Sequence, residues 1–297
     1  MTHNQPISIH FNKFWGGFLE GTNPNSVIFF IELFKKVFNT DVIVERDYIK
    51  ADILCEHMCH PEDSLIYKKQ WKYSFLATGE CVAVTQCTKF HFNDFSCILS
   101  GLKPDRDLKR LKFPLFTSYL FCNSEKSLEP IKIVPKKMVC AIIGNPNAIV
   151  RSKFLDALEK KTAISYGGPY RNNIGFCIGG DHNSNELINF IKEHKFMISM
   201  ENNKEDYYIT EKICNGLFAG VIPIYWGSPN ITEYFNEDRI LHLKDDSDNE
   251  INKIIDEMLN MSDDVYLEKV NSQIFKNGNN DTFIESITND IKDLINT

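Results

Sequence analysis

The sequence has no excess of positive charge and no apolar run long enough to cross a membrane. Its 33 Lys and Arg residues against 40 Asp and Glu residues give a formal net charge of −7, which argues against a nucleic-acid partner because phosphate backbones bind basic surfaces. The longest apolar stretches, such as residues 26–34, are far shorter than the roughly 20 residues of a membrane-spanning helix. Residues 1–9 are polar and do not resemble a signal peptide. We therefore expect a cytoplasmic protein with no direct membrane span.

Internal repeats and low-complexity blocks are also missing from the sequence. Its nine cysteines form an odd and scattered set, so we expect reduced thiols rather than disulfides. Cys55, His57, Cys59 and His60 lie close together in the sequence and are candidate metal ligands. Their spacing differs from that of a zinc finger and no second ligand pair follows, which favours an ordinary loop with incidental Cys and His side chains.

The apolar content is sufficient for two hydrophobic cores. Hydrophobic residues make up 43% of the 297 residues, and 22 of these residues are Phe. In the first half, strand-like and helix-like patterns alternate. The hydrophobic pattern predicts a helix at 26–38 and strands at 7–11, 41–45, 51–55 and 71–76. This order predicts a parallel sheet with helices on its faces.

A segment with two prolines and mixed charges, residues 124–137, interrupts the alternation and is predicted to be a linker. The pattern then resumes, with predicted strands at 138–143, 195–200 and 221–226 and predicted helices at 148–161, 208–219, 250–261 and 283–295. We therefore predict an α/β protein with two Rossmann-like domains that face a cleft, at residues 1–128 and 129–297. Open α/β sheets bind ligands beyond the carboxyl ends of their strands.

The clearest candidate site is the start of the predicted helix 208–219. This helix follows a nearly apolar strand and the polar loop Glu201-Asn202-Asn203. On a helix, Tyr208 would share a face with Glu211 and Lys212. Unpaired N–H groups and the positive end of the helix dipole suit a phosphate group, and Lys212 adds a full charge. Glu211 would repel a diphosphate, which fits a carboxylate that binds sugar hydroxyl groups. The alternative, an ordinary first turn with solvated side chains, stays open.

A second predicted helix start has the same design. The strand 138–143 leads into Gly144-Asn145-Pro146-Asn147, and Arg151 lies in the first turn that follows. Arg forms forked contacts with phosphate oxygens, although a solvent-facing helix Arg is the simpler alternative. In the same half, Gly167-Gly168-Pro169-Tyr170-Arg171-Asn172 either brings backbone close to a ligand or makes a turn.

Together these residues resemble the donor-binding signature of the α1,3-fucosyltransferase family (glycosyltransferase family ten), including its soluble bacterial-type members. The resemblance is specific from about Met138 to Phe235. It lies in Glu201-Asn202, Tyr208-Ile-Thr-Glu-Lys, Ala219-Gly-Val-Ile-Pro and Ile224-Tyr-Trp-Gly-Ser-Pro. In the first half, Trp71 to Glu80 resembles the segment that carries the family's catalytic carboxylate. The sequence departs from the family at Asn203, where the family has Ser.

The resemblance implies a GT-B fold and an inverting transfer of L-fucose from GDP-fucose to a hydroxyl group of an oligosaccharide or glycoconjugate, α1,3 to GlcNAc or Glc. It assigns acceptor binding to residues 1–128 and donor binding to residues 129–297. Arg151 and Lys212 would hold the diphosphate. The nucleotide and the fucose would be contacted by Asn202, Tyr208 and Glu211. Glu80 would be the general base.

The mechanism expected from this resemblance needs no cofactor and no divalent metal, because cations and helix ends meet the phosphate charge. Glu80 would remove the proton of the acceptor hydroxyl, whose oxygen attacks the anomeric carbon from the face opposite GDP. The run Asp245-Asp246-Ser247-Asp248 has the form of an Asp-x-Asp metal motif. Its position among polar residues favours a solvated turn instead.

Two other functions stay open. One is the same fold with a different nucleotide-sugar donor, since single positions in the sugar pocket would suffice to change it. The other is a catalytically inactive protein that binds sugar nucleotides or glycans; loss of Glu80 or Lys212 would indicate it, and both are present. For the acceptor, Phe14, Trp15 and Phe18 are candidates to stack on a sugar ring, although aromatic residues at such spacing more often lie in a core.

Overall fold

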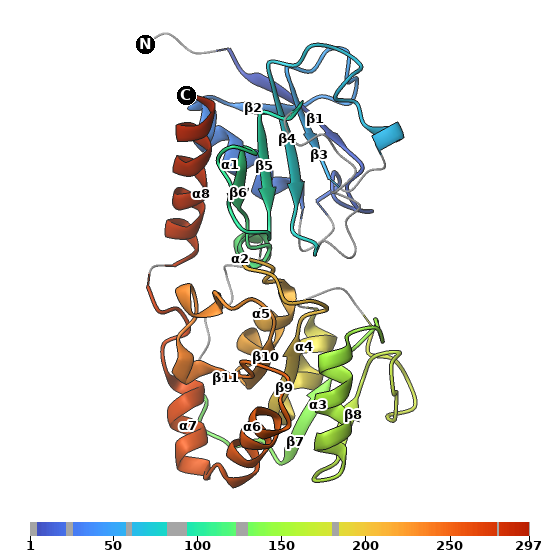
Figure 1. The fold of residues 1–297 in the computed structure, drawn as a ribbon, viewed down its shortest axis with the longest axis vertical. Coiled ribbons are helices and arrows are strands. Elements are labelled where there is room, and N and C mark those ends of the chain that lie inside the picture. Colours follow the sequence, from blue (N-terminus) through green and yellow to red (C-terminus); the bar gives the residue numbers. More distant parts are fainter. Residues whose placement is uncertain are drawn as a thin grey trace. The chain divides into compact units, whose positions relative to one another are not determined.

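The computed structural model describes residues 5–21, 26–57, 61–81, 94–122, 130–179, 184–277 and 279–296. The chain divides into two compact units. Unit 1 consists of Met1–Cys122, Glu205–Tyr208 and Asn279–Thr297, and unit 2 consists of Asn123–Lys204 and Ile209–Gly278. Each unit is built on a parallel sheet with helices on its faces, so the α/β fold class is confirmed (Figure 1).

Unit 1 holds a parallel sheet with the strand order β2-β1-β3-β4-β5-β6. All four strands predicted for this half are present, whereas β5 and β6 have no predicted counterpart. The side chains of β3 and β5 are buried along their whole length, as expected for parallel strands covered on both faces. The strands are β1 (Ile7–Asn12), β2 (Val42–Val44), β3 (Ile53–Glu56), β4 (Tyr73–Thr78), β5 (Cys97–Ser100) and β6 (Arg110–Lys112).

The helices α1 (Val27–Phe38), α2 (Phe116–Cys122) and α8 (Asn280–Ile295) pack against one another in unit 1. A 3-10 turn, η1 (Pro61–Asp63), follows the region of β3. α1 ends at Asn39, which adopts the left-handed conformation with φ 51°. The helices share one hydrophobic core with the sheet, to which α1 contributes Phe29, Phe30, Leu33 and Phe34 and α8 contributes Ile284, Ile287 and Ile291.

The aromatic residues after β1 belong to the same core. Phe18 is fully buried and stacks on Phe14 with 4.1 Å between ring centroids. Phe14 and Trp15 are partly buried and pack against that core. Their packing agrees with the simpler interpretation of these aromatic residues, and a contact with an acceptor sugar stays a prediction.

The division of the chain differs from the predicted boundaries 1–128 and 129–297 in two places. α8 and Glu205–Tyr208 belong to unit 1, although both follow residue 129. For α8 the reason is its apolar face, because Ile287 and Ile291 are buried in the core of unit 1. Of the predicted linker 124–137, residues 130–136 are irregular, and residues 123–129 lie outside the described residues.

Unit 2 holds a second parallel sheet, with the strand order β11-β10-β9-β7-β8. From β7 the chain adds β8 on one side and then β9, β10 and β11 on the other. The strand order therefore reverses between β7 and β9, which makes the carboxyl ends of these two strands the expected ligand-binding crevice of unit 2. The strands are β7 (Lys137–Ala141), β8 (Ile164–Tyr166), β9 (His194–Met200), β10 (Ile222–Trp226) and β11 (Leu241–His242).

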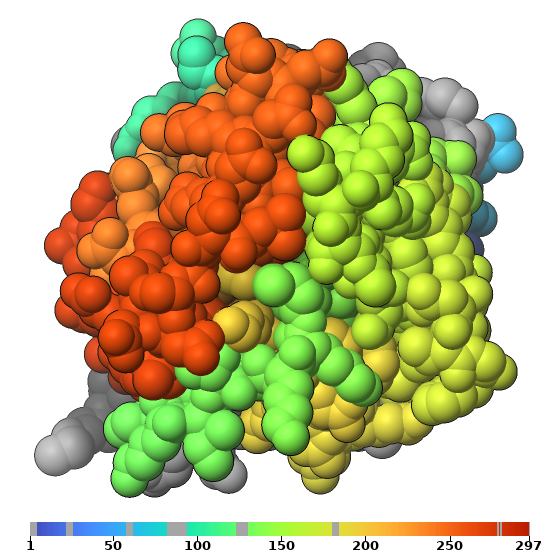
Figure 2. All heavy atoms as spheres, turned by 90° about the horizontal axis from the view of Figure 1, so that it is seen from below, coloured from blue at the N-terminus to red at the C-terminus, as the bar shows by residue number. Residues whose placement is uncertain are grey.

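Helices cover both faces of this sheet. Phe196, Ile198 and Met200 point from β9 into the core that holds α3 and α6, while Met197 points to the opposite face, towards α4. In Figure 2, the orange segment that contains α6 borders the light-green segment that contains α3. The helices of unit 2 are α3 (Ile149–Glu159), α4 (Asn185–Lys192), α5 (Glu211–Phe218), α6 (Asp248–Asn260) and α7 (Asp263–Asn271), with the short 3-10 turns η4 (Ile231–Glu233) and η5 (Glu237–Arg239).

Of the four candidate metal ligands near β3, Cys59 and His60 lie outside the described residues. His57 is buried, packs against Phe14 and Trp15, and donates from Nδ1 to the carbonyl oxygen of Ala77 at 2.7 Å. Burial lowers the pKa of His57 to about 4 and outweighs the hydrogen bond to Ala77, which acts in the opposite direction. His57 therefore has a structural role as a neutral core histidine at the carboxyl end of β3.

The low pKa of His57 predicts a loss of stability in mild acid. The unfolded chain takes up a proton near pH 6.5 and the folded chain only near pH 4, so the unfolded state is favoured progressively as the pH falls through this window. The shift corresponds to roughly 3 kcal/mol of unfolding free energy. His57→Asn retains an N–H donor but does not titrate, so it should lose less stability than the parent between pH 7 and pH 4.5 in urea unfolding. An equal loss in both proteins would contradict this assignment.

Candidate functional site

A cavity of about 240 Å³ opens in unit 2 at the carboxyl ends of β7 and β9. This is the position at which the strand order reverses, where open α/β sheets bind their ligands. The cavity has both polar and apolar lining residues. The polar ones, with Gly144, are Asn145, Arg151, Asn202, Glu211, Lys212 and Asn215, and the apolar ones are Ile142, Ile143, Ile178, Leu187, Met197, Ile198 and Met200.

Four of the five residues predicted to bind a donor line this cavity. They come from three separate segments of the chain: Arg151 from α3, Asn202 from the loop after β9, and Glu211 and Lys212 from the first turn of α5. The fifth, Tyr208, is not among the lining residues. The structure therefore brings together residues up to 61 positions apart in the sequence.

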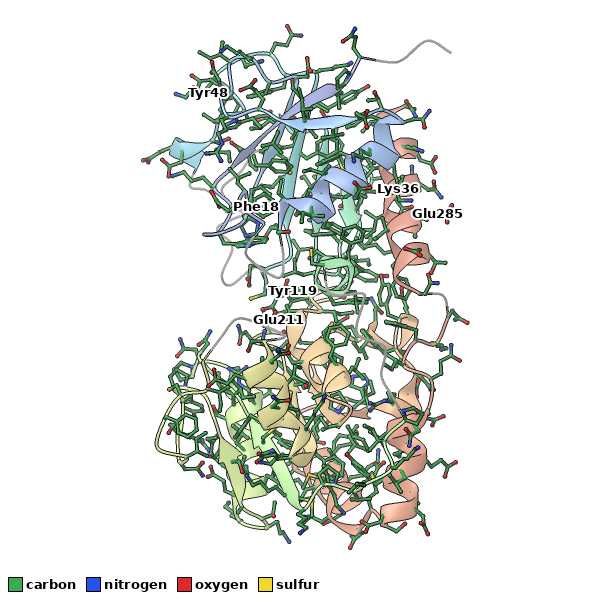
Figure 3. All side chains as sticks on the ribbon, turned by 180° about the vertical axis from the view of Figure 1, so that it is seen from behind. Phe18, Lys36, Tyr48, Tyr119, Glu211 and Glu285 are labelled. Carbon is green, nitrogen blue, oxygen red and sulfur yellow. The ribbon has the colours of Figure 1, made fainter. Side chains whose placement is uncertain are left out.

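The start of α5 depends on a buried carboxylate. Glu201 directly follows β9 and has no solvent exposure. Its Oε1 accepts the backbone N–H of Thr210 at 2.7 Å, and the Thr210 hydroxyl lies 2.8 Å from Oε2. Thr210 is held in an extended conformation by these contacts, and the helix begins at the next residue, Glu211 (labelled in Figure 3).

Lys212 lies against this pair. Its Nζ is 3.1 Å from Oε2 of Glu201 and 3.3 Å from Oε1 of Glu211, and it donates to the Thr210 hydroxyl at 2.9 Å. Burial raises the pKa of Glu201, whereas the charge of Lys212 and the hydrogen bonds from Thr210 favour the ionised form. The ammonium is thus held in one place at a helix N-terminus, with 24% of the Lys212 side chain exposed to solvent.

Arg151 is a second cation among the residues that line the cavity. Its side chain is almost fully buried, and Nη1 donates to the Met200 carbonyl and to Oδ1 of Asn202, both at 3.1 Å. Nη2 donates to the carbonyl oxygen of Asn145. Arg151 is therefore not the solvent-facing helix residue of the simpler alternative. It ties the loop after β7 to the end of β9 and orients Asn202.

Tyr208 does not share a helix face with Glu211 and Lys212, so this part of the prediction is wrong. It belongs to unit 1, where it is buried, and a Cβ atom on Gly101 would lie 3.0 Å from its Cα. The neighbouring Tyr207 donates its N–H to the Gly101 carbonyl at 2.7 Å. Because Glu201 captures the Thr210 N–H and residues 205–208 pack in unit 1, the predicted helix 208–219 cannot begin before Glu211. Its end is confirmed, with Gly220 at φ +71°.

Glu80 lies in unit 1, two residues after β4. Gly79 must be a glycine for this turn to pack, since a Cβ atom there would lie 2.4 Å from Cβ of Leu115. The backbone N–H of Glu80 donates to the Thr78 hydroxyl at 3.3 Å, and its side chain is half-buried. The position at the carboxyl end of a strand agrees with the prediction, and the catalytic role stays a prediction.

Two other sequence patterns have structural explanations. A Cβ atom on Gly168 would lie 2.4 Å from the backbone nitrogen of Ile143, so this glycine allows two backbone segments to approach each other. In the acidic run, Asp245 accepts the Ser247 N–H at 2.9 Å, Ser247 caps α6, and Asp248 pairs with Lys153 at 2.8 Å. This run is an exposed helix-capping turn, as the simpler interpretation predicted.

Three cavity or supporting residues had no predicted role: Asn145, Glu201 and Asn215. Asn215 lies four residues after Glu211, so the helical repeat alone places it on the same face.

No group of three or more His, Cys, Asp or Glu side chains suited to a metal ion occurs in the described residues. In the same part of the chain, no helix combines the length and apolar character that crossing a membrane requires.

Comparison with known proteins identifies the segment that forms this cavity. Residues 134–271 match the family model for glycosyltransferase family 10 (fucosyltransferase), C-terminal part. A segment of 104 residues is 38% identical to the α-(1,3)-fucosyltransferase FucT of Helicobacter pylori; it covers 35% of this chain and 20% of that protein. The chain thus spans about a fifth of the length of this relative.

Solved structures match the fold over nearly the whole chain. The crystal structure of an α1,3-fucosyltransferase has a TM-score of 0.74 and 20% sequence identity, over 98% of this chain and 90% of that one. A crystal structure of α1,3-fucosyltransferase with GDP-fucose has a TM-score of 0.67 over 97% of this chain and 90% of that chain, also at 20% identity. The two parallel α/β sheets and this likeness confirm the GT-B fold type.

The contact between Thr210 and Glu201 gives a test of how α5 is held. Thr210→Val removes the hydroxyl that joins Glu201 to Lys212 but keeps the side-chain shape, so it should lower the unfolding free energy by about 1–3 kcal/mol. Thr210→Ser keeps the hydroxyl and should retain most of the stability. Urea unfolding of the three proteins measures the difference, and equal stability of the Val variant and the parent would show that the hydroxyl is not needed.

Proposed function

We propose that the chain, whose residues 134–271 match the family model for glycosyltransferase family 10 (fucosyltransferase), transfers L-fucose from GDP-fucose to a hydroxyl group of a glycan. The observation that carries the proposal is the cavity between β7 and β9, which combines Arg151, Asn202, Glu211 and Lys212 at the start of a helix. A crystal structure of an α1,3-fucosyltransferase with GDP-fucose, which has a similar fold, supports the choice of donor.

The two halves of a sugar nucleotide differ in what they need from a site. A diphosphate needs positive charge and N–H donors, which Lys212, Arg151 and the first turn of α5 offer. A sugar needs acceptors for its hydroxyl groups, which Glu211 and Asn202 offer. The carboxylate of Glu211 next to a phosphate site is thereby explained, because it serves the sugar or ribose hydroxyls while Lys212 faces the phosphates. In this proposal Tyr208 adds a contact to the nucleotide or the fucose.

The proposed reaction is a single displacement with inversion at the anomeric carbon. The acceptor oxygen forms a bond to that carbon as the bond to the β-phosphate oxygen breaks, and the hydroxyl proton passes to the carboxylate of Glu80. Negative charge grows on the departing GDP, where Lys212 and Arg151 stabilise it. A positioned base typically contributes about 10²- to 10⁴-fold to the rate. Since protein cations meet the phosphate charge, the proposal includes no cofactor and no divalent metal.

The proposed acceptor is an oligosaccharide or glycoconjugate, with α1,3 linkage to GlcNAc or Glc. The name of the Helicobacter pylori relative supports the linkage. Unit 1 would bind the acceptor, because it contains the proposed base Glu80, whereas the cavity proposed for the donor lies in unit 2.

Transfer assays with a panel of nucleotide sugars and a glycan array test the proposed function. We expect labelled fucose to move from GDP-fucose to glycans that contain GlcNAc or Glc. Turnover with a different nucleotide sugar alone would contradict the choice of donor. Binding of sugar nucleotides without any transfer would favour a non-catalytic binding protein.

Replacement of Glu80 tests the base. Glu80→Gln keeps the size of the side chain but cannot accept a proton, so fucose transfer should fall by at least about 100-fold while GDP affinity stays the same. Transfer kinetics and calorimetry measure the two quantities. Glu285→Gln is a matched control, because Glu285 is an exposed residue of α8 (labelled in Figure 3). Unchanged turnover in Glu80→Gln would show that another group takes the proton.

A further inference from the structure

The cavity of unit 2 contains a polar group to which nothing above assigns a task, the carboxamide of Asn215. This residue lies in α5, one turn after Glu211, and lines the cavity. Only 6% of its surface is exposed. Its backbone carbonyl accepts the Ala219 N–H within the helix, but in the described part of the chain the side-chain amide has no hydrogen-bond partner. A mostly buried amide that lines a cavity and has no protein partner among the described residues is free to donate to and accept from a bound molecule.

The surroundings of Asn215 differ from those of the charged groups. Glu211 and Lys212 lie in the first turn of α5, and four further residues carry the helix about 6 Å along its axis. Apolar side chains from two elements that pack against α5 also line the cavity, namely Leu187 of α4 and Met197 of β9, both more than nine-tenths buried. The carboxamide lies one turn further along α5 than Glu211 and shares the cavity with these aliphatic side chains.

The parts of a sugar nucleotide differ in the lining residues that they match. A diphosphate requires cations, which Arg151 and Lys212 supply, and a hexose requires several polar partners for its hydroxyl groups. A purine base has two apolar faces and a polar edge, which match aliphatic walls and one carboxamide. The Nδ2–H group of an Asn can donate to O6 of guanine while its Oδ1 accepts N1–H.

We propose that Asn215 is a specificity-determining residue that binds the polar edge of the donor's guanine base. This inference rests on the proposed function, since it takes the cavity to be the site of GDP-fucose. It adds a residue that recognises the base to the residues that hold the diphosphate and the sugar.

A double comparison, in which the amide is removed from the protein and the base edge from the ligand, tests the proposal. The protein variant is Asn215→Ala, which leaves no other side chain without a partner and improves helix propensity. The ligand pair is GDP and purine riboside 5′-diphosphate, which keeps the ring, ribose and diphosphate but lacks O6, the N1 proton and the amino group. Calorimetry gives the four dissociation constants, and thermal unfolding confirms that the variant is folded.

We expect Asn215→Ala to weaken GDP about tenfold and to change the affinity for purine riboside diphosphate less than twofold. Lys212→Ala should weaken both ligands by the same factor, because both carry the diphosphate. Asn252→Ala is the matched control, since Asn252 is exposed on α6 of the same unit and does not line this cavity.

Two results would overturn the proposal. If Asn215→Ala leaves GDP binding unchanged, the amide does not contact the nucleotide. If it weakens both ligands equally, the amide acts on the shared ribose or diphosphate, or on the shape of the cavity. Failure of the parent protein to bind GDP or any other nucleoside diphosphate would be a different result, because it would remove the proposed function itself.

Discussion

The hydrogen-bonded contact between buried Glu201 and Thr210 is the interaction on which the candidate site depends. A carboxylate without solvent needs donors, and it finds them in the N–H and hydroxyl groups of Thr210 and in the ammonium of Lys212. These contacts fix Thr210 as the last residue before the helix, so that α5 begins at Glu211. They also hold the ammonium of Lys212 at the helix N-terminus. Because Glu201 and Thr210 are buried together, the arrangement exists before any ligand binds.

Arg151 is a second buried charged group in the cavity that needs hydrogen-bond partners from the protein. A nearly buried guanidinium has to place its N–H groups on carbonyl and amide oxygens, and those available here belong to the ends of β7 and β9. The two strands between which the order reverses are thereby joined by a charged side chain. A positive charge that already has structural partners moves little when a ligand arrives, which suits electrostatic stabilisation of a leaving group.

Much of the fold was predictable because apolar periodicity reports which face of an element is buried. The helix at Ile149–Glu159 and the nearly apolar strand at His194–Met200 are examples. The site was predictable in part, since Arg151, Glu211 and Lys212 have chemistry that suits a phosphate and a sugar at helix starts. Asn215 was within reach of the helical repeat. The position of Tyr208 was not predictable, because its assignment to the helix relied on sequence spacing alone. Spacing does not reveal that the buried carboxylate of Glu201 binds Thr210 and makes α5 begin at Glu211.

The sequence by itself determined the α/β class, part of the second half (β7, α3, β9, α5, β10, α6 and α8, but not β8, α4, β11 or α7), and the family resemblance of residues 138–235, because these depend on local pattern and on motifs that are contiguous in the chain. Only the tertiary structure decided that α8 packs in unit 1, that Arg151 contacts Asn202 from 51 residues away, and that Asn215 lines the cavity. The physical reason is that burial and hydrogen bonding between distant segments depend on the packed chain as a whole, and a local pattern does not record which distant group will meet a side chain.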